Sequence, residues 1–282
     1  MKYSAWLADA RQIHSYEPVA LDALSSYLNY EVSSHDAAKS IVAAEARVPP
    51  LQGGLIWGGL LSLAANDPEV HEQLVDLIKA IMSLPNKPQY PLGTAWRDTH
   101  DSIWSETIDF KNVRKIDRHN PDPLIKRWPA YHALTARLMA ASLLDAHYIA
   151  LTQIVHALET HLAYPPTPYQ AMNIAAAAQY FILCPVEVYL NPLRTKHQDD
   201  PGYGWKWGED MELWKGKLGW SAERWAFWKR RWAEVREMEA LSELAGLGDD
   251  VRELARRAEV GMDKVERAVA KKGETKVRRE GV

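Results

Sequence analysis

The stretch that decides the fold is WSAERWAFWKRRWAEV, at positions 220–235. Trp225, Trp228 and Trp232 recur at intervals of three and four residues, which places the three indoles on one face of a helix. Ser221 precedes them and belongs to a residue type that favours the N-cap position. The spacing therefore predicts an α-helix that begins at Ser221 and presents one aromatic face.

The same helical periodicity continues through most of the chain. Apolar residues recur at intervals of three and four in VALDALSSYLNYEV, at positions 19–32. Three strongly apolar segments follow at about 123–144, 145–162 and 168–183. Alternating runs of β-branched residues bounded by turns, the signature of strands, are absent. We predict an all-α fold, a single globular multi-helix bundle of about ten helices with a helical C-terminal appendage.

The domain organisation follows from length and composition. The chain has 282 residues, of which 47% are apolar and 25% charged, so it is long enough to bury a substantial core. We predict a helical globular domain over 1–245 and a helical appendage over 246–270. The basic tail over 271–282 is expected to be disordered.

Charge and cysteine content indicate the compartment and the classes of partner. The formal net charge of -3 disfavours nucleic acid as a partner. A single cysteine, Cys184, excludes an internal disulfide and fits a reducing compartment. The longest apolar stretch is shorter than the roughly 20 residues that span a bilayer. We therefore expect a cytoplasmic protein with no membrane partner.

The tryptophan face has two interpretations. A platform for single-stranded nucleic acid interleaves aromatic and basic residues on one surface. Here Trp225 and Trp228 lie on one face, whereas Arg230 falls on another. The pattern favours a stripe of core residues flanked by solvated charges, and the second interpretation is the wall of a ligand cavity.

No motif for a metal or a cofactor stands out. The acidic run DDVRE at 249–253 resembles a magnesium-binding motif, but it opens a helix, where carboxylates stabilise the first turn. His156 and Glu159 share a helix face, and no second such pair is present to complete a metal site. We predict neither a metal nor a cofactor.

Charged residues inside apolar helices are the most informative polar positions. Arg137 and Glu159 lie on consecutive predicted helices, and a buried charge is costly unless it is paired. One interpretation is a structural ion pair between them. The other is a polar cavity floor, in which Arg137 stabilises negative charge while Glu159 or His132 moves protons.

Aromatic and polar residues on the neighbouring predicted helices are candidates for binding a substrate. The candidate substrate-binding residues are Trp57, Arg97, His100, Trp104, Trp128, Tyr180, Trp225 and Trp228.

Several of these segments, taken in order, resemble a known family. They are LGTAWRDTHDSIW, WPAYHALTARLMA, HALETHL and GWSAERWAFWKRRWAEV. In their order and spacing they are similar to a large fungal family catalogued only as a domain of unknown function. The resemblance covers about 57–235 and implies a soluble, intracellular, helical protein. It also implies small-molecule chemistry for the members encoded beside genes of specialised metabolism, and it brings no catalytic residues.

Three functional hypotheses follow. The first is a cofactor-independent enzyme or binding protein of fungal specialised metabolism that holds a small molecule in a Trp/Tyr-lined helical cavity. Its chemistry would be a metal-free cyclisation, isomerisation, condensation or acyl transfer. The second is a non-catalytic module that binds a protein partner through an exposed tryptophan-rich segment at 203–232. The third is a transferase that uses an aminoacyl-RNA carrier and docks it on the basic stretch 264–279.

Overall fold

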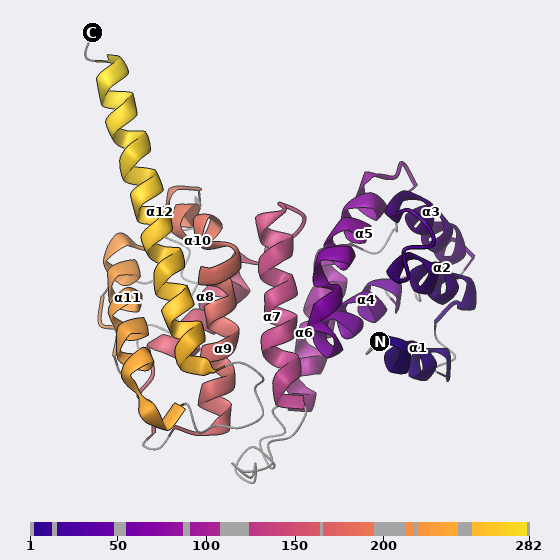
Figure 1. The fold of residues 1–282 in the computed structure, drawn as a ribbon, viewed down its shortest axis with the longest axis horizontal. Helices are drawn as coiled ribbons and strands as arrows, with labels where there is room; N and C mark the ends of the chain where they lie inside the picture. The colour runs from indigo at the N-terminus through magenta and orange to yellow at the C-terminus, as the bar shows by residue number, and fades with distance from the viewer. Residues whose placement is uncertain are drawn as a thin grey trace. The chain divides into compact units, whose positions relative to one another are not determined.

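A computed structural model describes residues 3–12, 16–47, 55–86, 91–107, 124–163, 166–194, 213–216, 219–241 and 250–280. Within these ranges every regular element is a helix (Figure 1). The prediction of an all-α fold is confirmed. The chain divides into two compact units, and each is described by itself.

Unit 1 comprises Met1–Asn112 and Lys126–Asp145. Its elements are α1 (Tyr3–Gln12), α2 (Pro18–Leu28), α3 (Ser34–Glu45), α4 (Leu55–Asn66), the 3-10 helix η2 (Pro68–Val70), α5 (His71–Ser83), α6 (Leu92–Thr107) and most of α7 (Leu124–Ala140). Helix α3 packs against both α2 and α5, and α4 packs against α6. The apolar stripe of α5, with Leu74, Leu77 and Ile78, is completely buried, as its periodicity predicts.

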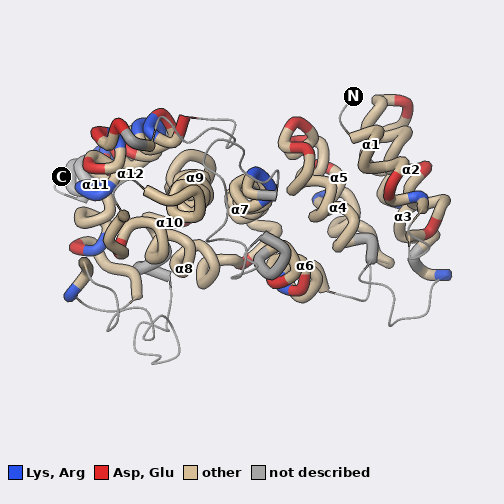
Figure 2. The backbone as a smooth tube through the Cα atoms, turned by 90° about the horizontal axis from the view of Figure 1, so that it is seen from below, with Lys and Arg blue, Asp and Glu red and all other residues tan. Residues whose placement is uncertain are grey.

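Unit 2 comprises Val113–Ile125 and Ala146–Val282. Its elements are α8 (His147–Leu158), α9 (Pro168–Leu183), α10 (Pro185–Arg194), α11 (Ala222–Glu237), the 3-10 helix η5 (Glu239–Leu241) and α12 (Val251–Glu280). Helix α9 packs against α8, α10 and α12, and α11 packs against α12 and α8. Helices α8 and α9 carry no Lys, Arg, Asp or Glu, whereas both charge signs recur along α12 (Figure 2). Unit 2 is thus built around uncharged helices.

The contact between α9 and α12 depends on a glycine. A Cβ atom added at Gly261 would lie 2.0 Å from the carbonyl oxygen of Phe181, far inside any allowed contact. The missing side chain therefore lets the two helix backbones approach each other closely. Leu254, Ala258 and Met262 of α12 are also buried.

Helix α12 is one continuous element from Val251 to Glu280. A glycine within a helical pattern is a weak stop signal, and here Gly261 is retained for packing. The predicted domain limits at 245 and 270, and the disorder expected over 271–282, stay predictions. Among the described helices, none is long and apolar enough to cross a membrane.

Candidate functional site

Among the described residues of unit 2, Glu159 and Arg224 form a fully buried ion pair. Arg224 Nε donates to Glu159 Oε1 at 2.6 Å, and Arg224 Nη2 donates to Oε2 at 2.7 Å. Neither side chain is exposed to solvent. Glu159 is the C-cap residue of α8, and Arg224 lies in the first turn of α11. The pair therefore fastens the end of one helix to the beginning of another through a bidentate contact.

Further hydrogen bonds extend this pair into a network. Trp228 Nε1 donates to Glu159 Oε1 at 2.7 Å, and Arg224 Nη1 donates to the carbonyl oxygen of Gly219 at 2.7 Å. Gly219 has a φ of 71°, a conformation that glycine adopts without strain. The network thus positions both the Trp228 indole and the turn that precedes α11.

Arg137 and Glu159 do not form the ion pair that the sequence predicts. Arg137 Nε donates to Glu72 Oε1 at 2.6 Å, and both residues belong to unit 1. The Arg137 side chain is 26% exposed, whereas Glu159 in unit 2 is fully buried on Arg224. The prediction of this pair is wrong because Arg224 lies one turn before Trp228 and faces the same carboxylate.

A pocket lies beside this network. It has a volume of about 120 Å³ and is partly open to solvent. The lining residues are Val188, Tyr189, Trp220, Ser221, Ala222, Trp225 and Trp228. They come from α10, the turn before α11 and the first two turns of α11. Trp225 and Trp228, two of the predicted substrate-binding residues, therefore do line one pocket.

Hydrogen bonds and ring contacts fix the aromatic side chains that line the pocket. Trp228 is held by Glu159, and Trp225 Nε1 donates to Glu266 Oε1 of α12 at 2.8 Å. The Tyr189 ring meets the Trp225 ring edge to face, at 4.9 Å between centroids and 80° between planes. Rings fixed in this way present a preformed apolar surface.

The third indole of the pocket is different. Trp220 is only 5% exposed, and its buried Nε1 has no hydrogen-bond partner among the described residues. A buried donor without an acceptor is rare because it forfeits the hydrogen bond that it makes with water when the chain is unfolded. Trp232 Nε1 is in the same state in the described part of the chain, but Trp232 does not line the pocket.

The other candidate residues lie elsewhere. Trp57 and Tyr180 are fully buried in the cores of units 1 and 2, respectively. Arg97 is exposed on α6. Trp104 falls within α6, but its side chain lies outside the part of the chain that the structure describes. The substrate-binding roles assigned to these four residues stay predictions.

His100, Trp128 and His132 come together in an aromatic cluster of unit 1. The His132 ring meets the Trp128 ring edge to face at 4.4 Å and lies 6.0 Å from the His100 ring. Trp96 and Tyr131, which the sequence analysis did not single out, join the same cluster. Complete burial, and then the charge of His100, lowers the pKa of His132 well below its usual value, so its imidazole is neutral at pH 7. A proton-transfer role for His132 stays a prediction.

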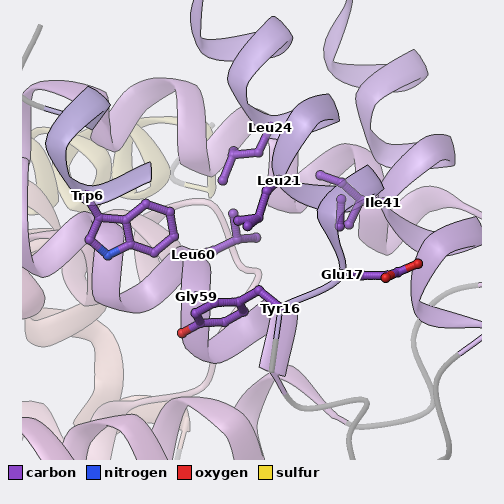
Figure 3. A pocket seen from close by; sticks show the side chains of 9 residues that line it. Trp6, Tyr16, Glu17, Leu21, Leu24, Ile41, Gly59 and Leu60 are labelled. Carbon is purple, nitrogen blue, oxygen red and sulfur yellow. The ribbon is translucent and has the colours of Figure 1, made fainter. Parts of the chain in front are cut away.

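A second pocket, in unit 1, is too small to hold a ring-sized ligand. Trp6, Tyr16 and Leu21 surround it, and the Tyr16 ring lies close to Gly59 (Figure 3). Its volume of about 20 Å³ matches a single water molecule.

Two other chemistries find no support in the described residues. These residues include no group of three or more His, Cys, Asp or Glu side chains that could hold a metal ion. Cys184 is buried, and burial followed by the charge of Glu187 raises the pKa of its thiol. A thiol protonated in this way is a poor nucleophile.

The described tryptophans of the tryptophan-rich segment 203–232 are not exposed, and binding of a protein partner through this segment stays a prediction. Its described part covers 213–216 and the residues from 219 onward, while 203–212 lie outside the described residues. The described tryptophans of the segment, all 9% exposed or less, are Trp214, Trp220, Trp225, Trp228 and Trp232. The network of Glu159 and Arg224 explains this burial, since it draws the start of α11 into the core.

Comparisons with known proteins place the chain in a family but assign it no activity. No curated protein and no solved structure matches the chain. One family of protein sequences does match, over residues 57–232, and its description is "Protein of unknown function (DUF3632)". That span includes Glu159, Arg224 and the pocket residues of α10 and α11. The chain therefore belongs to the DUF3632 family.

Proposed function

We propose that this protein is a small-molecule-binding protein, and that the ring of its ligand enters the pocket between α10 and α11. The observation that supports this proposal most strongly is the preformed wall of Tyr189, Trp225 and Trp228 beside an empty volume of about 120 Å³. Apolar pockets with a few polar groups at fixed positions are the usual form of ligand sites.

The volume limits what the pocket can hold. An engineered protein cavity of about 150 Å³ admits benzene. The pocket here is slightly smaller but partly open, so one six-membered ring fits inside while its substituents reach solvent. The ligand is thus a planar ring or a short branched alkyl group, bare or as the end of a larger molecule.

The proposal gives Glu159 a structural role. Both of its oxygens already accept hydrogen bonds, from Arg224 and from Trp228, and its side chain is fully buried. A general base must reach the proton that it abstracts. We assign Glu159 to positioning the Trp228 wall, in place of the catalytic role that the sequence analysis considered.

Two further expectations of the sequence analysis stay proposals, and the second is an alternative to the small-molecule function. A place in fungal specialised metabolism comes from the family resemblance alone. Docking of an aminoacyl-RNA would use 264–279, whose side chains from 272 onward lie outside the described residues.

Saturation-transfer NMR with toluene tests the proposal. Ala222 lines the pocket and is exposed, and Ala226, one turn later on α11, is also exposed but does not line it. We expect transfer to toluene from the unmodified protein and from Ala226→Leu, but not from Ala222→Leu, whose larger side chain reduces the space in the pocket. No transfer in the unmodified protein, or equal transfer in both variants, would refute the proposal.

A further inference from the structure

The pocket between α10 and α11 is lined mainly by aromatic rings. Tyr189, Trp220 and Trp225 all line it, and each keeps part of its surface exposed. The planes of Tyr189 and Trp225 stand at 80° to each other, with 4.9 Å between the ring centroids. The faces of aromatic rings are electron-rich and attract cations, and a cluster of such rings is the usual site for a quaternary ammonium group.

The charges next to these rings have the sign that favours a cation. Trp225 Nε1 donates to Glu266 Oε1 at 2.8 Å, so a carboxylate lies at the edge of this indole. Glu266 shares its counter-ion, because Lys229 Nζ lies 2.7 Å from Glu266 and 2.6 Å from Asp263. Two carboxylates therefore meet one ammonium group, and a negative charge remains in excess beside Trp225.

The lining itself adds no positive side chain. No Lys, Arg or His is among the described residues that line the pocket. Ser221 and Ala222 belong to the N-terminus of α11, where a helix carries a positive partial charge, but Glu223 in the same turn offsets it. Arg224 lies behind the pocket and is neutralised by its ion pair with Glu159.

The hydrogen-bonding groups of the pocket distinguish between kinds of cation. A primary ammonium group donates three hydrogen bonds. Among the described lining residues, the side-chain oxygens that could accept them are the hydroxyls of Tyr189 and Ser221. A quaternary nitrogen donates none, so it enters such a pocket without leaving a donor unsatisfied.

We infer that the ligand is an aromatic cation, a ring with a quaternary nitrogen of the N-alkylpyridinium class. Its ring lies against Tyr189, Trp220 and Trp225, and the excess negative charge beside Trp225 complements its positive charge. This inference rests on the proposed function, since it names the chemical class of the ligand for the same pocket.

Three probes of nearly equal size and shape test the charge. Toluene is neutral, N-methylpyridinium is its cationic isostere, and benzoate is an anion. We expect N-methylpyridinium to bind about 5- to 30-fold more tightly than toluene, and benzoate to bind more weakly than toluene. The dissociation constants are measured by NMR titration of the indole N–H signals.

Matched variants test the contribution of the rings. Tyr189→Leu removes a ring and keeps an apolar side chain, whereas Tyr189→Phe keeps the ring. Tyr148→Leu, on α8, removes a tyrosine of the same unit that does not line the pocket. We expect Tyr189→Leu to weaken N-methylpyridinium binding by about fivefold or more while toluene binding stays within threefold. Tyr189→Phe and Tyr148→Leu are expected to bind N-methylpyridinium as the unmodified protein does.

The outcomes separate the two proposals. If toluene binds and N-methylpyridinium binds no more tightly, or if benzoate is the tightest probe, the cation inference is overturned and the binding function stands. Equal weakening of toluene and N-methylpyridinium by Tyr189→Leu would also overturn it. If that variant does not fold, the comparison of the three probes on the unmodified protein decides alone. If none of the three probes binds, the proposed function itself fails.

Discussion

Arg224 and Glu159, which are 65 positions apart in the sequence, form a bidentate ion pair from which water is excluded. Through the same side chains, Glu159 holds the Trp228 indole and Arg224 holds the carbonyl oxygen of Gly219. One buried pair therefore positions two walls of the pocket, the ring of Trp228 and the turn that carries Trp220.

Breaking this ion pair should lower the stability of the protein. Arg224→Met leaves the Glu159 carboxylate buried without its counter-ion, and we expect a loss of about 3–5 kcal/mol in the free energy of unfolding. Adding Glu159→Gln to this variant removes the stranded charge and keeps an oxygen for Trp228. The double variant should thus lose less than the sum of the two single variants in urea unfolding. Additivity within about 0.5 kcal/mol would show that the pair is not coupled.

Arg137 provides the contrast. Its ion pair with Glu72 is partly exposed, with side-chain exposures of 26% and 79%. Exposed pairs contribute about 0–1 kcal/mol. We expect Arg137→Ala to lower the free energy of unfolding by no more than that and to leave saturation transfer to toluene unchanged. A loss of transfer in this variant would support the site role that the sequence analysis assigned to Arg137.

The close approach of α9 and α12 predicts a large effect from one methyl group. Gly261→Ala places its Cβ 2.0 Å from the carbonyl oxygen of Phe181, so the helices must separate. We expect a loss of about 2 kcal/mol or more, within the range for severe overpacking. At Gly58 in α4 the nearest atom to an added Cβ is 3.9 Å away, and Gly58→Ala should stabilise the chain by up to about 1 kcal/mol. Thermal unfolding of both variants checks the pair of predictions, and a neutral Gly261→Ala would contradict the first.

Stability should fall in mild acid through the buried histidines. Burial lowers the pKa of His71 to about 4, and its Nε2 bonds to the carbonyl oxygen of Ala64 at 2.8 Å. Between pH 6.5 and pH 4 the unfolded chain binds this proton and the folded chain does not, so stability decreases as the pH falls through that window. At pH 4.5 the expected loss from His71 alone is about 2–3 kcal/mol relative to pH 7.

His71→Gln isolates this contribution, because glutamine keeps a donor for Ala64 and does not titrate. The lowered pKa values of His100, His132 and His156 act in the same direction and remain in both proteins. We therefore expect urea unfolding to show a shallower pH dependence in the variant. An unchanged slope would show that His71 is not the titrating group.

Much of this fold is predictable from sequence because it depends on local periodicity. Ser221 is the N-cap of α11 as predicted, and its side chain accepts from the Arg224 amide. The ends of helices are harder to predict. A glycine such as Gly261 is a helix breaker by its intrinsic propensity, whereas in this fold it lies inside α12 and lets the helix pack closely against α9. Local patterns report on single helices, whereas packing between helices depends on the whole chain.

Only part of the site could be predicted from the sequence, because contacts between helices are not encoded in local patterns. Trp225 and Trp228 carry a clear signal in their spacing, and both line the pocket. The partner of Glu159 depends on which helices are neighbours, and sequence order favoured Arg137 over Arg224. A usable signal was present, since Arg224 lies four residues before Trp228 and so shares its helix face.

The central claim is tested most directly by the indole N–H signals in a ¹H–¹⁵N NMR spectrum. Trp220→Phe assigns the Trp220 signal, and Trp232→Phe assigns that of Trp232. We predict that toluene changes the chemical shift of the Trp220 indole signal, because Trp220 lines the pocket, while the Trp232 signal stays in place. A Trp220 signal that stays fixed at saturating toluene would contradict the account.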